Sequence, residues 1–271
     1  MDADPYVFGP DSEMWRINRE RCGLFFGPAA AILQVAHPRV AQGVHDHSRF
    51  RSDTLGRLRR TLQATNRIAF GRRSEAEAMR DQLARVHSRI RGETANGVPG
   101  PKTYSADEPD LLLWVLATLI VAAIDGYELV HGPLPADRKQ AFYADMIRFG
   151  TYFGVEESTC PESWTAFEEY YRSMIEGDLL GSHPICAEVS HGIVRPRDSL
   201  AVRSLGTVID FLPIETLPEP VRSRLGIRST PWTRSRMNLI RRTAPRWFPR
   251  LPERQRFYFE YLEARRNFGS R

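Results

Sequence analysis

Leu111 to Ile124 has the sequence LLLWVLATLIVAAI, an apolar run of 14 residues between Asp110 and Asp125. A helix that is apolar on every side must be buried, either in a protein core or in a bilayer. Crossing a bilayer takes roughly 20 apolar residues, and this run is shorter. We therefore predict a buried core helix over 107–130, against which the rest of the chain packs.

The chain on either side of this run has apolar residues three and four apart, as in amphipathic helices, and few alternating runs typical of strands. Capping residues and glycines divide the pattern into helices. We predict helices over 12–35, 38–48, 54–70, 74–91, 107–130, 136–153, 161–177, 198–211, 219–225, 232–243 and 253–267, with a loop at 92–106, a proline-rich connector at 243–252 and an irregular segment around 183–191. Within 12–35, the stretch after Gly27 either continues the first helix or starts another. The prediction is an all-α protein in which residues 1–271 form a single domain of about ten helices.

The composition is that of an ordinary globular protein and excludes several classes. With 42% hydrophobic and 26% charged residues in 271, disordered, collagen-like and coiled-coil chains are excluded. The three cysteines form no Cys-x-x-Cys pair, which argues against a zinc site and against covalently attached haem. The first residues lack the basic and apolar regions of a secretory signal, so we expect a cytoplasmic protein.

The net charge of +5 is distributed unevenly along the chain. Residues 222–271 contain fourteen arginines and three glutamates, a net +11, so residues 1–221 carry −6. Aromatic residues alternate with these arginines, a mixture that suits an anionic membrane surface and equally a core with arginines outside. Nucleic acid is less favoured, because no binding module is recognisable. A homodimer through this face remains open.

Arg57, Arg60 and Thr61 stand at positions i, i+3 and i+4, so they share one face of the helix over 54–70. Two permanent cations and a hydroxyl on one face suit an anion, a haem propionate or dioxygen. The alternative is a solvated basic stripe, because arginine is usually exposed. The spacing alone does not decide between them.

Two histidines stand where they are either core residues or ligands. His87 shares its helix with Leu83 and Ile90, beside an apolar stripe made with Met79 and Val86. A hydrogen-bonded core histidine is the default interpretation there. His37 precedes a proline at a helix start and has the same ambiguity. No hydrolase, phosphate-loop or zinc-protease signature accompanies them.

Four blocks occur in an order that resembles one known family. They are AHPRVAQGVHDHSRFRSDTLGRLRRT from Ala36 to Thr61, Phe70-Gly71, RVHSRIRG from Arg85 to Gly92, and YSADEPDLLLWVLAT from Tyr104 to Thr118. Together they resemble the MpaB and rubber-oxygenase catalytic domain family, over about 20–245 of the chain. An ordered series of blocks is more specific than any single one.

The resemblance implies an all-α, globin-like fold with one non-covalent haem b and dioxygen-dependent oxidation of a small apolar substrate. Rubber oxygenases have an Arg-x-x-Lys-Thr motif over the haem and a histidine ligand on a later helix. Arg57 and Thr61 match the first and last motif residues, Arg60 replaces the lysine, and His87 is the ligand candidate. We also assign His37 to cofactor binding.

Two departures from the family pattern bear on this assignment. Arg60 cannot supply a neutral amine, because arginine stays protonated. Leu116 stands where many members have a histidine, and a leucine can neither ligate nor donate. From the resemblance we predict a haem b-dependent oxygenase. Because of the two departures we keep an alternative, a non-catalytic, haem-free helical protein that docks on an anionic membrane or partner through residues 222–271.

Overall fold

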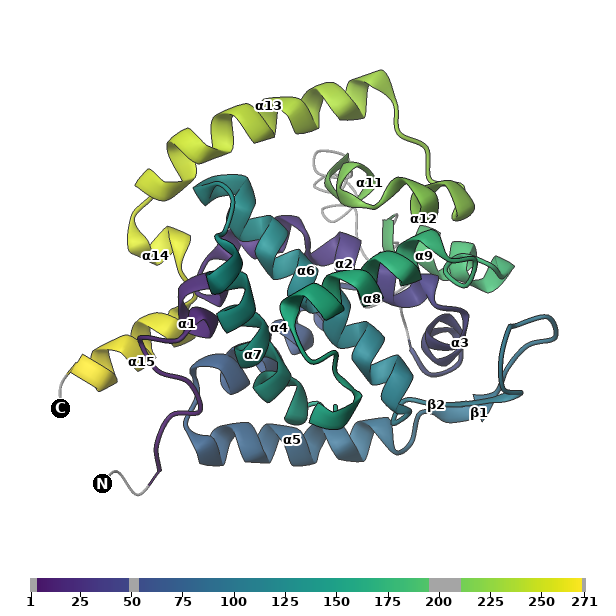
Figure 1. The fold of residues 1–271 in the computed structure, drawn as a ribbon, viewed down its shortest axis with the longest axis horizontal. Helices are drawn as coiled ribbons and strands as arrows, with labels where there is room; N and C mark the ends of the chain where they lie inside the picture. The colour runs from purple at the N-terminus through teal and green to yellow at the C-terminus, as the bar shows by residue number, and fades with distance from the viewer. Residues whose placement is uncertain (1–3, 49–53, 195–210, 270–271) are drawn as a thin grey trace.

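The computed structural model describes residues 4–48, 54–194 and 211–269, which form a helical assembly around one central helix (Figure 1). Its helices are α1 (Glu13–Asn18), η1 (Arg21–Phe25), α2 (Gly27–Ala36), α3 (Pro38–His47), α4 (Thr54–Phe70), α5 (Arg73–His87), α6 (Pro109–His131), α7 (Ala136–Thr151), η2 (Glu157–Thr159), α8 (Trp164–Glu176), α9 (Pro184–Val194), α11 (Phe211–Thr216), α12 (Glu219–Arg224), α13 (Pro231–Trp247), η3 (Phe248–Arg250), α14 (Glu253–Arg256) and α15 (Phe259–Gly269). Among the described residues, β1 (Arg91–Glu93) and β2 (Thr103–Ser105) form a small antiparallel sheet. The all-α prediction is confirmed.

The predicted core helix is α6, which runs for 23 residues and therefore extends beyond its apolar run. It packs against η1, α2, α7 and α13. By length and composition it is the candidate membrane span among the described residues, with a mean hydropathy of 1.8 over a window that is 50% buried. In this fold it is the central core helix, with Trp114, Ala117 and Ile120 fully enclosed.

One close contact brings η1 against α6. A Cβ on Gly126 of α6 would lie 2.8 Å from the Cα of Gly23 in η1, so position 126 needs the space that glycine leaves, whereas a Cβ on Gly23 would meet nothing within 4 Å. Of the two forms predicted for 12–35, the structure shows the one with a new helix at Gly27 and not one continuous helix. The segment is divided into α1, η1 and α2, because it must turn to follow the surface of α6.

Other differences from the predicted elements lie near proline and in the hairpin. Residues 184–194 form α9, where an irregular segment was predicted, and α5 ends at His87, before the hairpin strand β1 begins at Arg91. Helix α13 continues through Pro245 to Trp247, although a connector was predicted there. The helix predicted over 198–211 lies almost entirely outside the described residues.

The ends of the chain meet on one side of the molecule (Figure 1). Residues Glu20 and Phe257 form an isolated bridge, and the amide of Tyr258 donates to the carbonyl oxygen of Arg19 at 3.1 Å. Below this bridge, α15 packs on α4. The prediction of a single domain over 1–271 stays a prediction.

Candidate functional site

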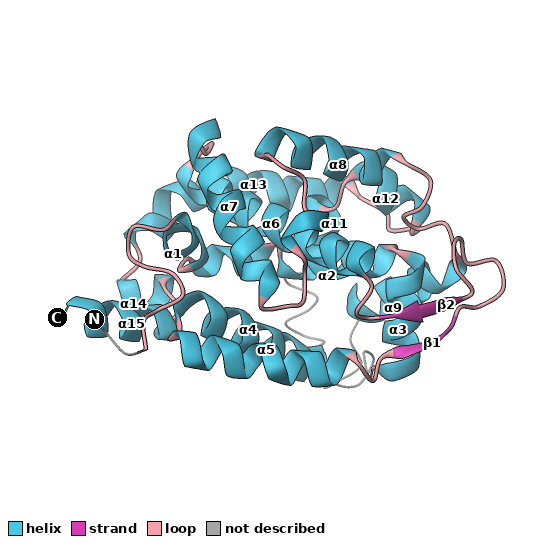
Figure 2. Cartoon of the chain, turned by 60° about the horizontal axis from the view of Figure 1, so that its bottom comes forward, coloured by secondary structure: helices cyan, strands magenta, loops and turns pink. Residues whose placement is uncertain are grey.

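Four of the five predicted site residues, all except His37, lie on two consecutive helices, α4 and α5, which lie side by side (Figure 2). Two residues, Gly71 and Arg72, connect the helices, so the chain returns antiparallel. The first turns of α4, which include Arg57, and the last turn of α5, which ends in His87, therefore lie at the same end of the pair. The fold brings these two parts of the prediction together.

The two halves of α4 differ in burial. Ala64, Ile68 and Ala69 in the second half are buried in the core, whereas the side chains of Arg60 and Thr61 in the first half are exposed. The side chain of Arg57 lies outside the described part of the structure. The exposed first half thus carries two hydrogen-bond donors, a guanidinium and a hydroxyl, at the protein surface.

His87 continues the inward face of α5. Ala76 and Met79 are buried and Leu83 is partly buried, and His87 follows them at a spacing of four residues. Val86, which we placed on this stripe, is instead 48% exposed, so the stripe is narrower than predicted. Burial lowers the pKa of His87, and the charge of Asp107 only partly offsets this effect. The imidazole is therefore neutral at neutral pH, the form that presents a lone pair to a metal.

All seven histidines lie in described residues, and His87 differs from the other six. The others bond through the ring: His37 to the amide of Arg39, His45 to Asp46, His47 to Tyr104, His131 to Glu20, His183 to the carbonyl of Asn96, and His191 to the carbonyl of Leu225. Within the described chain, neither ring nitrogen of His87 has a hydrogen-bond partner. A half-buried histidine with two unused ring nitrogens does not fit the default interpretation of a hydrogen-bonded core residue.

His37 is the N-cap of α3 and is only 5% exposed. Its Nδ1 accepts a hydrogen bond from the amide of Arg39 at 3.3 Å, which places the ring proton on Nε2. Burial lowers the pKa of His37 to about 4, further assisted by the charge of Arg39, although Asp110 acts in the opposite direction. In this tautomer His37 donates from Nε2 and does not ligate through it, which suits an anionic group of a cofactor.

An ion-pair cluster beside His37 was not predicted from the sequence. The buried side chain of Arg39 pairs with Glu108 and, at 3.4 Å, with Asp110, and it donates to the carbonyl of Thr103 at 3.3 Å. Next to it, Tyr104 donates to Asp46 at 2.7 Å. The partners are about 60 to 70 positions apart, so local spacing carries no signal of them. Two of the four blocks that carry the family resemblance, 36–61 and 104–118, meet at this cluster.

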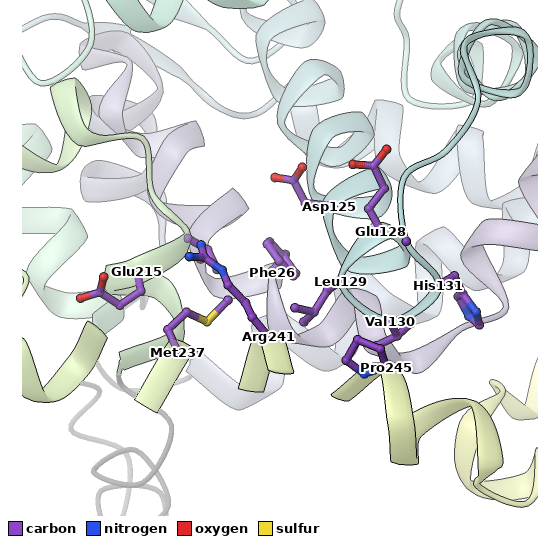
Figure 3. Close-up of a pocket in the computed structure, with 12 residues that line it drawn as sticks. Phe26, Asp125, Glu128, Leu129, Val130, His131, Glu215, Met237, Arg241 and Pro245 are labelled. Atoms are coloured by element: carbon purple, nitrogen blue, oxygen red, sulfur yellow. The ribbon is translucent and has the colours of Figure 1, made fainter. Parts of the chain in front are cut away.

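A separate cleft opens between α6 and α13 (Figure 3). Its volume is about 730 Å³, within the range of small-molecule sites. Leu129, Met237 and Pro245 give it an apolar wall, and Asp125 and Arg241 lie on opposite sides. Neither this cleft nor a neighbouring one of about 390 Å³ is lined by the residues predicted as the site.

Asp125 lies between the two clefts and lines both. Burial and the nearby charge of Glu128 raise its pKa to about 6, against the opposing influence of Lys139 and Arg241. No hydrogen bond or ion pair within 4 Å joins its carboxyl group to another described residue. A carboxyl group that titrates near neutral pH can exchange a proton or bind a donor, but it does so apart from α4 and α5.

The described residues contain no cluster of three His, Cys, Asp or Glu side chains suited to a metal ion. A haem needs only one protein ligand to its iron, so a single neutral histidine beside a face of donors is the pattern to expect. The described part of the chain is thus a helical protein with a half-buried, neutral histidine at the end of α5.

Comparison with known proteins identifies the family. The family model described as ER-bound oxygenase mpaB/B'/Rubber oxygenase, catalytic domain, matches residues 15–247. The chain belongs to this family, which is described as an oxygenase catalytic domain. The resemblance carried by the four sequence blocks is confirmed.

Two mycobacterial relatives match part of the chain. One uncharacterized protein of Mycobacterium tuberculosis and one of Mycobacterium bovis are each 31% identical over 155 residues, which is 55% of this chain and 59% of the relative. The match therefore spans little more than half of these relatives. No solved structure matches the chain.

Leu116, where many family members have a histidine, is a core residue here. It is 3% exposed, and a Cβ on Gly150 of α7 would lie 2.7 Å from its Cδ2 atom. The leucine side chain thus occupies the space that Gly150 leaves between α6 and α7. It lines neither cleft, so this departure changes core packing.

Proposed function

We propose that this protein is a haem b-dependent oxygenase that uses dioxygen to oxidise a small, largely apolar molecule. The family supports the oxygenase class. The observation that supports haem is His87, whose half-buried ring is kept neutral by burial and has no hydrogen-bond partner in the described chain. Neutral imidazole is a good ligand of haem iron.

The residues of α4 and α5 divide the work of holding the cofactor. Bound haem would supply the redox-active iron at which dioxygen is activated. His87 would hold it through one ring nitrogen from the end of α5. Arg57, Arg60 and Thr61 would donate hydrogen bonds to propionates, or to oxygen atoms that gain negative charge during the reaction. Because Arg60 stays protonated, it acts as a donor and not as a base.

The surroundings of His87 support an apolar substrate. Met79 and Leu83 precede it on the same face of α5, so the protein surface leading to the ring is apolar. Apolar walls exclude water and favour molecules with little polar surface. His37, a donor through Nε2, would anchor an anionic edge of the cofactor from the start of α3.

The test is the absorption spectrum of the protein expressed with a haem precursor, followed by reduction and exposure to carbon monoxide. We expect a Soret band that shifts on reduction, with about one iron per chain by elemental analysis. His87→Ala is expected to abolish the band while the far-ultraviolet circular dichroism stays unchanged.

His45→Ala is the matched control, because His45 is exposed on α3 and already engaged by Asp46. We expect it to keep the wild-type spectrum. A colourless wild type that also fails to bind added haemin would overturn the haem proposal. An unchanged Soret band in His87→Ala would overturn the assignment of the ligand.

A further inference from the structure

The outward face of α13 carries large apolar side chains and arginines. Trp232, Ser235, Leu239, Arg242 and Arg246 follow each other at alternating spacings of three and four residues, so they form one stripe along the helix. We call these five residues the α13 stripe. Trp232 is 70% exposed and Leu239 is 61% exposed, whereas Met237 and Ala244 on the opposite face are buried.

Four of the five arginines of α13 have no ion-pair partner among the described residues. The helix contains five arginines and no acidic residue. Arg234, Arg241, Arg242 and Arg246 form no ion pair with any described carboxylate, while Arg236 lies over the Phe211 ring at 4.4 Å. This charge is complementary to an anionic partner.

The exposed apolar residues favour a lipid surface among anionic partners. Leu239 and Trp232 gain free energy by leaving water at the boundary of headgroups and acyl chains, where tryptophan is enriched in membrane proteins. A nucleic acid would use the arginines and leave Leu239 in water. Helix α13 lies along one outer edge of the molecule, at the top of Figure 1, so a flat surface can approach it.

We propose that the α13 stripe docks the protein peripherally on an anionic lipid surface. The arginines contact the headgroups, and Trp232 and Leu239 enter the interface beside them. This surface is distinct from the predicted haem residues on α4 and α5, so it does not depend on the proposed oxygenase chemistry. For an enzyme that oxidises apolar molecules, docking would give access to compounds dissolved in the bilayer.

Vesicle co-sedimentation tests the proposal with the full chain. We expect binding to phosphatidylcholine vesicles that contain about one third phosphatidylglycerol, no binding to pure phosphatidylcholine, and loss of binding at roughly 0.5 M salt. The double variant Leu239→Ser with Arg242→Gln is expected to bind at least about tenfold more weakly. Because both side chains are exposed, its thermal unfolding should match the wild type.

The matched control exchanges the same residue types on α5, which lies at the opposite edge of Figure 1. Val86 is 48% exposed and follows the exposed Arg85, and the variant Val86→Ser with Arg85→Gln should bind like the wild type. Three outcomes would overturn the proposal: no vesicle binding at low salt, unchanged binding by the α13 variant, or tighter binding to duplex DNA than to anionic vesicles. If the wild type and the α5 variant are dimers and the α13 variant is a monomer, the stripe binds a second copy of the chain instead, which would also overturn the proposal.

Discussion

His37 and His87 show how the same side chain is given different tasks by what faces its two ring nitrogens. Burial lowers the pKa of both residues, so both are neutral under physiological conditions. The amide of Arg39 occupies one nitrogen of His37 and fixes its tautomer. His87 has no such partner in the described chain, so either nitrogen is available to a ligand.

The low pKa of His37 predicts acid sensitivity of folding. Its pKa is about 4 in the folded protein and near 6.5 when unfolded, so the unfolded chain binds a proton more readily. The stability that depends on a neutral His37 is fully present above the pKa of His37 in the unfolded chain. It is lost as the pH falls toward the pKa of His37 in the folded protein. His37→Asn keeps a good N-cap and removes the titration, so lowering the pH from about 7 to about 5 should cost the wild type about 2 kcal/mol more than this variant.

Urea unfolding at both pH values measures this difference. Equal losses in the wild type and in His37→Asn would show that other groups cause the acid sensitivity. The variant should still unfold in a single transition, because Asn accepts the same amide hydrogen bond.

At this scale the sequence predicts some features of the site and misses others. The common face of Arg57, Arg60 and Thr61 follows from helical spacing alone, and α4 forms as predicted. The sequence does not indicate that the ring nitrogens of His87 lack a partner, or that Arg39 pairs with Glu108. Both features depend on residues that are distant in sequence. Only the three-dimensional structure brings those residues together.

Among the elements, two glycines determine how closely α6 is packed. Gly126 lets η1 approach to backbone contact, and Gly150 makes room for Leu116. At both positions the obstacle to a larger residue is a neighbouring group held in the core. Helix α6 is therefore held in place by shape as well as by its apolar surface.

Gly126→Ala is expected to destabilise the protein by about 1 to 3 kcal/mol, because the new methyl group would meet the backbone of Gly23. Gly27→Ala is the control, since a Cβ at the start of α2 meets nothing within 4 Å. It should be neutral or slightly stabilising. Chemical denaturation of the two variants measures both effects, and equal stabilities would contradict the close approach.

Helical periodicity predicts α4, α6 and α7 within two residues or so, because each has a clear apolar face or run. It fails where tertiary contacts override it. The first predicted helix breaks to follow α6, and α13 tolerates Pro245 at a position where the helix surface faces solvent. These departures depend on packing partners that local sequence does not specify.

At the scale of the molecule, one buried carboxylate joins the two ends of the chain. Glu20 is 2% exposed. The Nε of Arg256 donates a hydrogen bond to its carboxylate at 2.8 Å, and the Nε2 of His131 in α6 lies 3.2 Å from the same carboxylate. Burial acts to raise the pKa of Glu20, but the bonds from His131 and Arg256 outweigh it and lower the pKa overall. Three distant segments meet at this carboxylate.

Arg256→Gln should destabilise the protein by about 3 kcal/mol, because it leaves the buried Glu20 with only part of its compensation. Arg254→Gln, two residues away and exposed, should leave stability within about 0.5 kcal/mol of the wild type. Thermal and urea unfolding provide the comparison. A loss of similar size in both variants would show that the effect is one of net charge.

The bridge between Glu20 and Phe257 shows that the folded core includes residues beyond the stretch that the family model matches. The family model ends at residue 247, but Phe257, Tyr261 and Ala264 beyond it are buried in the main core, where Tyr261 lies 5.6 Å from Trp15. A fragment cut at residue 247 would expose the Trp15 side of that core and leave Glu20 without its arginine. Any expression fragment or domain exchange must therefore carry the chain through α15.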